Sequence, residues 1–150
     1  MRTRVLIVAV ILATLVTGIA WRVTAQAADP DVITEGDIQL TDEMRQWVEA
    51  RKTIPGVHIG VFDGFRLVLI SAGEKPTAGY AVTVENVTRN GQAWIIRARN
   101  TGPAGGMVAQ VITHPYALVG VKGDVELPIR VQDPASGRDW PAAVRQTTPI

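Results

Sequence analysis

The sequence predicts a mainly β fold, a small antiparallel sandwich or curled sheet of six to seven short strands with one N-terminal helix. Two observations carry this prediction. After residue 56, short runs of β-branched and aromatic residues alternate with turn residues at close intervals. One amphipathic stretch, residues 41–52, precedes these runs. The length of 150 residues is typical of one domain, and the absence of cysteine means that the core holds the fold without disulfides.

The first 28 residues have the layout of an export segment. Arg2 and Arg4 precede an apolar run at residues 5–21, and Ala25-Gln26-Ala27 is a small-residue cleavage pattern. The apolar run is at the lower limit of what can span a bilayer, so an uncleaved membrane anchor is the alternative to a cleaved signal peptide. Either segment predicts an extracytoplasmic protein, whether secreted, periplasmic or in the cell envelope.

The formal net charge of +1 depends on the export segment. Residues 1–27 contain three arginines and no acidic residue, so the rest of the chain has 12 basic and 14 acidic residues. A slightly acidic composition does not indicate the basic surface that binding to nucleic acid or anionic lipid requires. We therefore expect no nucleic-acid partner, and membrane contact only through the N-terminal segment where it is retained.

The next two segments are a linker and the helix. Residues 29–40 are polar without clear periodicity, which favours a linker. Thr41 is a suitable N-cap for a helix over residues 41–52, and Met44, Trp47 and Val48 follow at helical spacing as an apolar stripe. The Ile-Pro-Gly sequence that follows ends the helix.

A first hairpin is predicted from residues 57–62 and 65–70. Asp63-Gly64 between them is a strong signal for a two-residue turn. The β domain with its leading helix is expected to extend to residue 132.

A second hairpin is predicted from residues 80–87 and 93–98, with turn residues 89–91 between them. A two-residue Asn-Gly loop would pair Val84 with Arg97 and would place charge on an apolar face. That register is therefore disfavoured, because a slip by one residue moves every side chain to the other face.

The favoured alternative is a three-residue loop with Gly91 in the left-handed conformation. It pairs Val84 with Ile96 and Val82 with Ala98, and it collects the apolar side chains on one face. That predicted face comprises Tyr80, Val82, Val84, Trp94, Ile96 and Ala98.

Three further strands and a tail complete the expectation. Residues 107–113, 116–121 and 125–131 have strand composition, and the first two are separated by His114-Pro115, where a bend or a sheet edge is expected. Residues 133–150 are polar and proline-containing, which predicts a mobile tail. Trp140 in this tail is expected to dock either on the domain or on a partner.

Two glycine-rich turns and the segment after them resemble a known family. The residues concerned are Glu74-Lys75-Pro76-Thr77-Ala78-Gly79-Tyr80, Thr101-Gly102-Pro103-Ala104-Gly105-Gly106 and Gln110-Val111-Ile112-Thr113-His114-Pro115-Tyr116. In order and spacing they resemble the PrcB-like family of protease-complex subunits, over roughly residues 57–131. The resemblance implies an envelope protein that stabilises or assembles a surface protease. The cysteine that anchors lipoprotein members has no counterpart in this chain.

No motif predicts catalysis. The two histidines, His58 and His114, lack metal-ligand spacing, Ser71 and Lys75 lack the spacing of acyl-serine enzymes, and no cofactor motif is present. We therefore predict a non-catalytic protein-interaction module without metal or cofactor, with an envelope protease or another exported protein as its partner. A carbohydrate- or cell-wall-binding β module is the alternative, and an enzyme is a third.

The glycine-rich turns and the break before residue 116 are the predicted contact surface, because binding residues concentrate on loops of a rigid scaffold. Addition of a partner strand to an exposed edge near this break is the expected mode of contact. The candidate partner-binding residues are Thr77, Ala78, Gly79, Thr101, Gly102, Pro103, Gly105, Gly106, His114, Pro115 and Tyr116.

Overall fold

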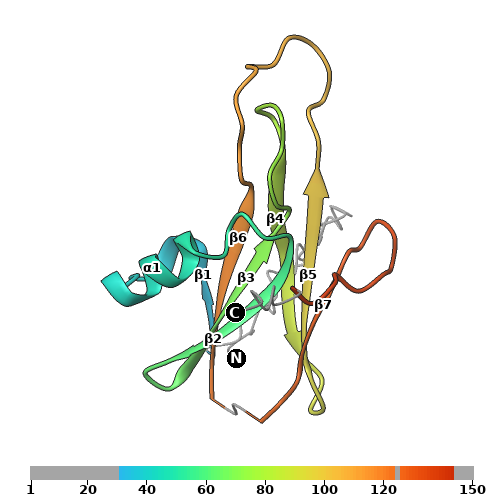
Figure 1. The fold of residues 1–150 in the computed structure, drawn as a ribbon. Helices are drawn as coiled ribbons and strands as arrows, with labels where there is room; N and C mark the ends of the chain where they lie inside the picture. Colours follow the sequence, from blue (N-terminus) through green and yellow to red (C-terminus); the bar gives the residue numbers. More distant parts are fainter. Residues whose placement is uncertain (1–30, 124–125, 144–150) are drawn as a thin grey trace, which may run out of the picture.

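The fold is given by a computed structural model, which describes residues 31–123 and 126–143. The predicted export segment, residues 1–28, lies outside the described residues. Among the described residues the mainly β class is confirmed: seven strands form two sheets, accompanied by one short α-helix and one 3-10 turn (Figure 1). In chain order the elements are β1 (Val32–Thr34), η1 (Glu35–Asp37), α1 (Asp42–Glu49), β2 (Gly56–Phe62), β3 (Phe65–Ser71), β4 (Ala81–Arg89), β5 (Trp94–Thr101), β6 (Tyr116–Lys122) and β7 (Ile129–Gln132).

The two sheets differ in strand direction. The first has the order β1-β6-β3-β2, and every neighbouring pair in it is antiparallel. The second has the order β4-β5-β7, and β7 lies parallel to β5. Between β5 and β7 the chain forms β6, which belongs to the first sheet. β7 then returns to the second sheet and runs in the same direction as β5. The sequence predicts an antiparallel sandwich, and the structure departs from this prediction at one pair, β5 with β7.

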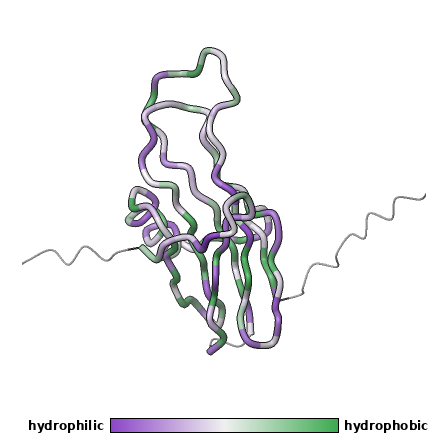
Figure 2. The backbone as a smooth tube through the Cα atoms, turned by 90° about the vertical axis from the view of Figure 1, so that its right-hand side faces the viewer, coloured by the Kyte–Doolittle hydropathy of each residue, from purple (hydrophilic) through white to green (hydrophobic). Residues whose placement is uncertain are grey.

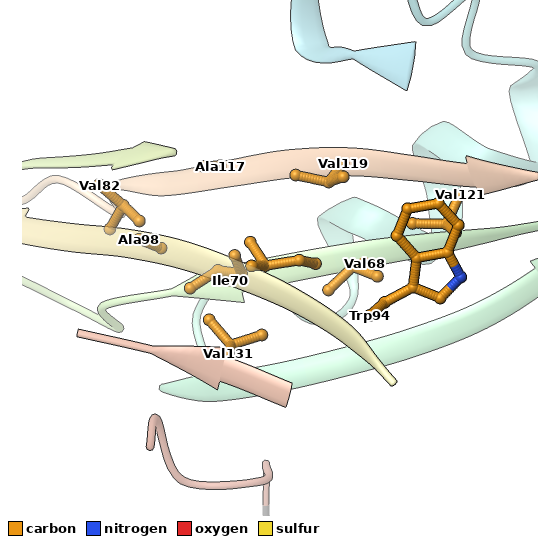
Figure 3. Packing of buried hydrophobic residues seen from close by; sticks show 10 residues of the cluster. Val68, Ile70, Val82, Trp94, Ala98, Ala117, Val119, Val121 and Val131 are labelled. Carbon is orange, nitrogen blue, oxygen red and sulfur yellow. The ribbon is translucent and has the colours of Figure 1, made fainter. Parts of the chain in front are cut away.

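The main core lies between the two sheets (Figure 3). Trp94 is its largest side chain and is completely buried, and Ile96 and Ala98 from the same strand face the same side. The first sheet contributes Val68 and Ile70 to this cluster. Burial of these side chains is the main stabilising term of the fold, because each removes apolar surface from water.

A second, smaller cluster covers the outer face of the first sheet. Met44 and Val48 of α1 pack on Leu67 and Leu69 of β3. Because the other face of β3 meets the main core, residues 67–70 are buried on both sides of the sheet. The continuous apolar run Leu67-Val68-Leu69-Ile70 is typical of such a doubly covered strand.

The predicted helix cap is confirmed. The Thr41 side chain accepts a hydrogen bond from the Met44 backbone N–H at 3.3 Å, and α1 ends at Glu49, three residues earlier than predicted. The first hairpin is also confirmed, since Phe62 pairs with Phe65 across the turn. Asp63 and Gly64 have φ angles of 37° and 83°, and two such positive angles characterise the tight hairpin turn that Asp-Gly favours.

The predicted register of the second hairpin is wrong. Arg89 pairs with Trp94, which leaves a four-residue loop in which the Asn90 side chain accepts hydrogen bonds from the Gln92 and Ala93 N–H groups. These bonds satisfy the loop backbone and favour a loop one residue longer than expected. Gly91 does adopt the predicted left-handed conformation, with φ of 80°.

A β-bulge between Val84 and Asn86 adjusts the same hairpin. Val84 pairs with Ala98 instead of Ile96, and Ile96 pairs with Val87. The extra residue in β4 reverses the alternation, so Val87 packs on the same core as Val84. Of the predicted apolar face only Tyr80 is misplaced, since it precedes β4 and lies outside the core cluster.

Three other segments differ from the predictions. Residues 29–40 are not only a linker, because Val32–Thr34 forms β1 and pairs with β6. Residues 107–113 form no strand, and a single bridge joins Thr113 to Lys75. The strand predicted at 125–131 is shorter and later, at Ile129–Gln132.

The polar segment after residue 132 is held on the domain as far as Ala143. The Trp140 indole N–H donates to the Ala98 carbonyl at 2.9 Å, and the ring packs against the main core. Near the start of β2, the Val57 N–H donates to the Pro141 carbonyl at 2.9 Å, and the Val57 carbonyl accepts from the Ala143 N–H at 3.0 Å. Trp140 therefore docks on its own domain, the first of the two alternatives.

An ion pair in this segment gives a pH-dependent prediction. Hydrogen bonds from Arg130, and then from Gln132, hold the pKa of Asp139 below its usual value of 3.8. The stability that Asp139 contributes is therefore fully present above pH 3.8 and is lost as the pH falls through its lower folded pKa. We expect Asp139→Asn to flatten the pH dependence of the urea midpoint below pH 4. An equally steep profile in Asp139→Asn would contradict this assignment, and Arg130→Ala is the matched variant expected to flatten it too.

Candidate functional site: a projecting arch

One long loop projects beyond both sheets. Residues 102–115 connect β5 to β6 and form an arch at one end of the domain (Figures 1 and 2). A shorter loop, residues 72–80, connects β3 to β4 at the same end. We call residues 102–115 the arch and residues 72–80 the support loop.

Backbone hydrogen bonds hold the arch on the support loop. Lys75 and Thr113 exchange two of them, with N···O distances of 2.8 and 2.9 Å. The Ala78 N–H donates to the Ala109 carbonyl at 3.0 Å, and the Thr113 hydroxyl donates to the Thr77 carbonyl at 3.0 Å. The arch is thus fixed at several points although it contains no strand.

Close packing fixes the first half of the arch. Gly79 has φ of 90°, and a Cβ at this position would lie 2.9 Å from the Pro103 Cβ. Gly102 lies against the Tyr80 ring, where a Cβ would be 3.4 Å from a ring carbon. The Lys75 ammonium sits 5.5 Å from the centre of the same ring. Glycine at these two positions therefore permits the close approach of the two loops.

The base of the arch is joined to the sheet. The Ala72 N–H donates to the Pro115 carbonyl at 3.0 Å, and Tyr116 pairs with Ser71 as the first residue of β6. The His114 ring lies 3.7 Å from the Glu74 carboxylate. No strand precedes His114-Pro115, so these residues do not separate two strands as predicted, and they mark the point where the arch enters β6.

The arch exposes apolar side chains without charged ones. Met107 is fully exposed, and Val111 and Ile112 are 48% and 63% exposed. No lysine, arginine, aspartate or glutamate occurs from residue 102 to residue 115. These three residues are most of the large hydrophobic side chains that are exposed in the described parts of the chain, the others being Ile59 and Val61 on β2. Exposed apolar residues gathered on one projecting loop are typical of a contact surface.

The predicted site residues are distributed over the support loop, the arch and the strands that flank the arch. They lie in the support loop (Thr77, Ala78, Gly79), at the end of β5 and in the first half of the arch (Thr101, Gly102, Pro103, Gly105, Gly106), and at its base (His114, Pro115, Tyr116). Met107, Val111 and Ile112 are not among the predicted contact residues, because the composition of residues 107–113 predicts a strand there. The absence of charge across the whole segment was the signal that set this loop apart.

Side chains with catalytic potential have structural partners. The His58 ring is bonded to the Ile54 carbonyl at 2.9 Å, and the buried Ser71 hydroxyl donates to the Lys52 carbonyl at 2.6 Å. Within residues 31–123 and 126–143, no three histidine, aspartate or glutamate side chains are grouped as metal ligands would be. In the same ranges, no helix has the length and apolar character needed to cross a bilayer.

The comparisons with known proteins give one match. Residues 66–122 match the family model described as PrcB C-terminal. The matched segment runs from β3 to β6, so it contains the support loop and the entire arch. No curated protein and no solved structure matches the chain.

Proposed function

We propose that this chain, whose residues 66–122 match the PrcB C-terminal family model, is an exported, non-catalytic module that binds an envelope protease and stabilises or assembles it. The matched family is associated with proteases as an accessory family, which supports this role. The arch is the contact surface in this proposal. The observation that carries it is the exposure of Met107, Val111 and Ile112 on an uncharged loop that is bonded to the support loop.

A protein surface suits the arch better than a membrane. Gly105 and Gly106 lie exposed in the arch, with φ angles of 101° and 86°, so their backbone groups would enter any surface that the arch contacts. Unpaired backbone groups are costly in hydrocarbon, whereas a protein pocket can bond them. The arch also lacks the lysines and arginines that attract anionic lipid headgroups.

A carbohydrate-binding role has less structural support than a protein-binding role. Such a module requires exposed aromatic rings, and residues 102–115 contain none. Trp94 is completely buried, and Tyr80 is half-buried against Gly102. Sedimentation of the chain with isolated cell-wall material would favour this alternative over the protease partner.

The proposal is tested by capture of the partner in cells. We expect crosslinking of the full-length, C-terminally tagged chain, followed by mass spectrometry, to enrich an envelope protease. The triple variant Met107→Ser, Val111→Ser, Ile112→Ser should lower this enrichment at least tenfold, because anchors of an interface each contribute more than about 1 kcal/mol.

The matched control is Ile59→Ser with Val61→Ser. These two side chains are exposed and apolar like those of the arch, but they lie on β2. The control should capture the protease as well as the unmodified chain does. Equal capture by the arch variant, or capture without any protease, would overturn the proposed function.

A further inference from the structure

A groove separates the two sheets along one side of the sandwich. Its volume is about 300 Å³, and it lies between β4 of one sheet and β6 of the other. None of its lining residues is charged, and most are small: Thr34, Gly36, Val82, Thr83, Val84, Val87, Ala117, Leu118 and Val119. We call this groove the seam. Its composition suits uncharged aliphatic side chains and would desolvate a charged group without compensation.

The sheet edge beside the seam is incomplete. β6 pairs with β3 over its whole length, from Tyr116 to Lys122. On its other side β1 pairs only with Val119–Val121, because the chain continues after Thr34 as the 3-10 turn η1, which is not a strand. In the described structure, residues 116–118 therefore have a strand neighbour on one side only. An additional strand could bond there, in line with β1, and cover the seam with its inward side chains.

The arch contains a segment with the properties of such a strand. Residues 107–112, Met-Val-Ala-Gln-Val-Ile, are uncharged and rich in β-branched residues, yet they form no strand within their own chain. Met107, Ala109 and Val111 alternate along the segment and are all exposed. The backbones of Ala109 and Thr113 face the support loop, so those of the intervening residues 110 and 112 face away from it.

We propose that residues 107–112 of one copy of the chain occupy the seam of a second copy, as a strand added beside residues 116–118 of β6. The absence of charge on both surfaces argues for this occupant, because residues 107–112 and the lining of the seam both lack charged side chains. An acyl chain would fill the seam but would leave the backbone groups of β6 without partners. The segment cannot enter its own seam, because bonds to Lys75 and Ala78 hold it on the support loop.

The contact joins two different surfaces, so every copy is both donor and acceptor. Such a contact closes as a reciprocal pair or a larger ring, or continues as an open chain of copies, according to the rotation that relates neighbouring copies. It uses the same side chains as the proposed protease contact. Self-association therefore covers the arch until a protein partner displaces the second copy.

Single cysteines test the contact directly, because the natural chain has none. Two full-length chains with different tags are co-expressed, one carrying Val111→Cys and the other Thr83→Cys, and a mild oxidant is added. Both positions are exposed, so both substitutions leave the core intact. We expect a disulfide-linked pair that carries both tags. The matched control replaces Thr83→Cys by Arg138→Cys, an exposed position on the segment after β7, and should give at least fivefold less linked product.

A second measurement uses association without crosslinking. Co-purification of one tagged full-length chain by the other should fall at least fivefold with Val111→Asp in both chains, and should persist with Val61→Asp in both. Equal crosslinking in the two cysteine pairs, or loss of association only with Val61→Asp, would overturn the proposal. Both measurements use a host that lacks the partner protease, so their failure is distinguishable from failure of the proposed function.

Discussion

Replacement of Trp94 by alanine is expected to lower the free energy of unfolding by about 3–5 kcal/mol, as for other large aromatic side chains removed from a core. Trp94 is completely buried between the sheets, at the start of β5, and it faces Val68 and Val121 in the main core (Figure 3). Alanine would remove the transfer free energy of the ring and leave a cavity that the surrounding strands cannot fill. Urea unfolding of the full-length chain, followed by far-UV circular dichroism, measures the loss.

A phenylalanine at the same position separates packing from hydrogen bonding. The Trp94 indole nitrogen is buried and has no hydrogen-bond partner among the described residues. Trp94→Phe therefore removes no hydrogen bond and retains much of the apolar ring, so it should cost clearly less than Trp94→Ala. Equal costs for the two variants, or a cost below 1 kcal/mol for alanine, would show that Trp94 is not the centre of the core.

Leu69→Ala is expected to lower the free energy of unfolding by about 2–5 kcal/mol. Leu69 is completely buried on the outer face of β3, under Met44 and Val48 of α1. The loss would be large only if the helix covers this face, because an exposed leucine contributes little. The same urea measurement therefore tests whether the sheet is covered on both sides.

Val61→Ala is the matched control for this second prediction. Val61 is on β2 in the same sheet but is 66% exposed, so its truncation should change stability by less than about 0.5 kcal/mol. A loss for Leu69→Ala as small as that for Val61→Ala would contradict the packing of α1 on the sheet.

Both stability predictions concern the body of the domain, whereas the proposed contact surface lies outside it. Met107, Val111 and Ile112 are exposed and belong to neither hydrophobic cluster. Their substitution can therefore remove a contact without unfolding the chain. This separation makes loss of capture by an arch variant interpretable as loss of the contact.

Local features of the fold were predictable from the sequence where they depend on neighbouring residues. Asp63-Gly64 set the first hairpin, because this dipeptide favours the two-residue turn in which both φ angles are positive. Thr41 set the start of α1 through a bond to the third residue after it. The register of the second hairpin was not predictable from pattern alone, because the Asn90 side-chain bonds and the bulge after Val84 changed the count of residues together.

The sequence by itself determined the strand-rich class, the helix cap, the first turn and the family resemblance, since each depends on residues close together in the chain. Only the tertiary structure decided that Val32–Thr34 completes a sheet, that Trp140 docks on Ala98, and that residues 107–112 remain outside both sheets. Strand composition in residues 107–112 predicts pairing but names no partner. Pairing depends on which edge lies within reach, and the bonds to the support loop hold this segment away from the edges of its own sheets.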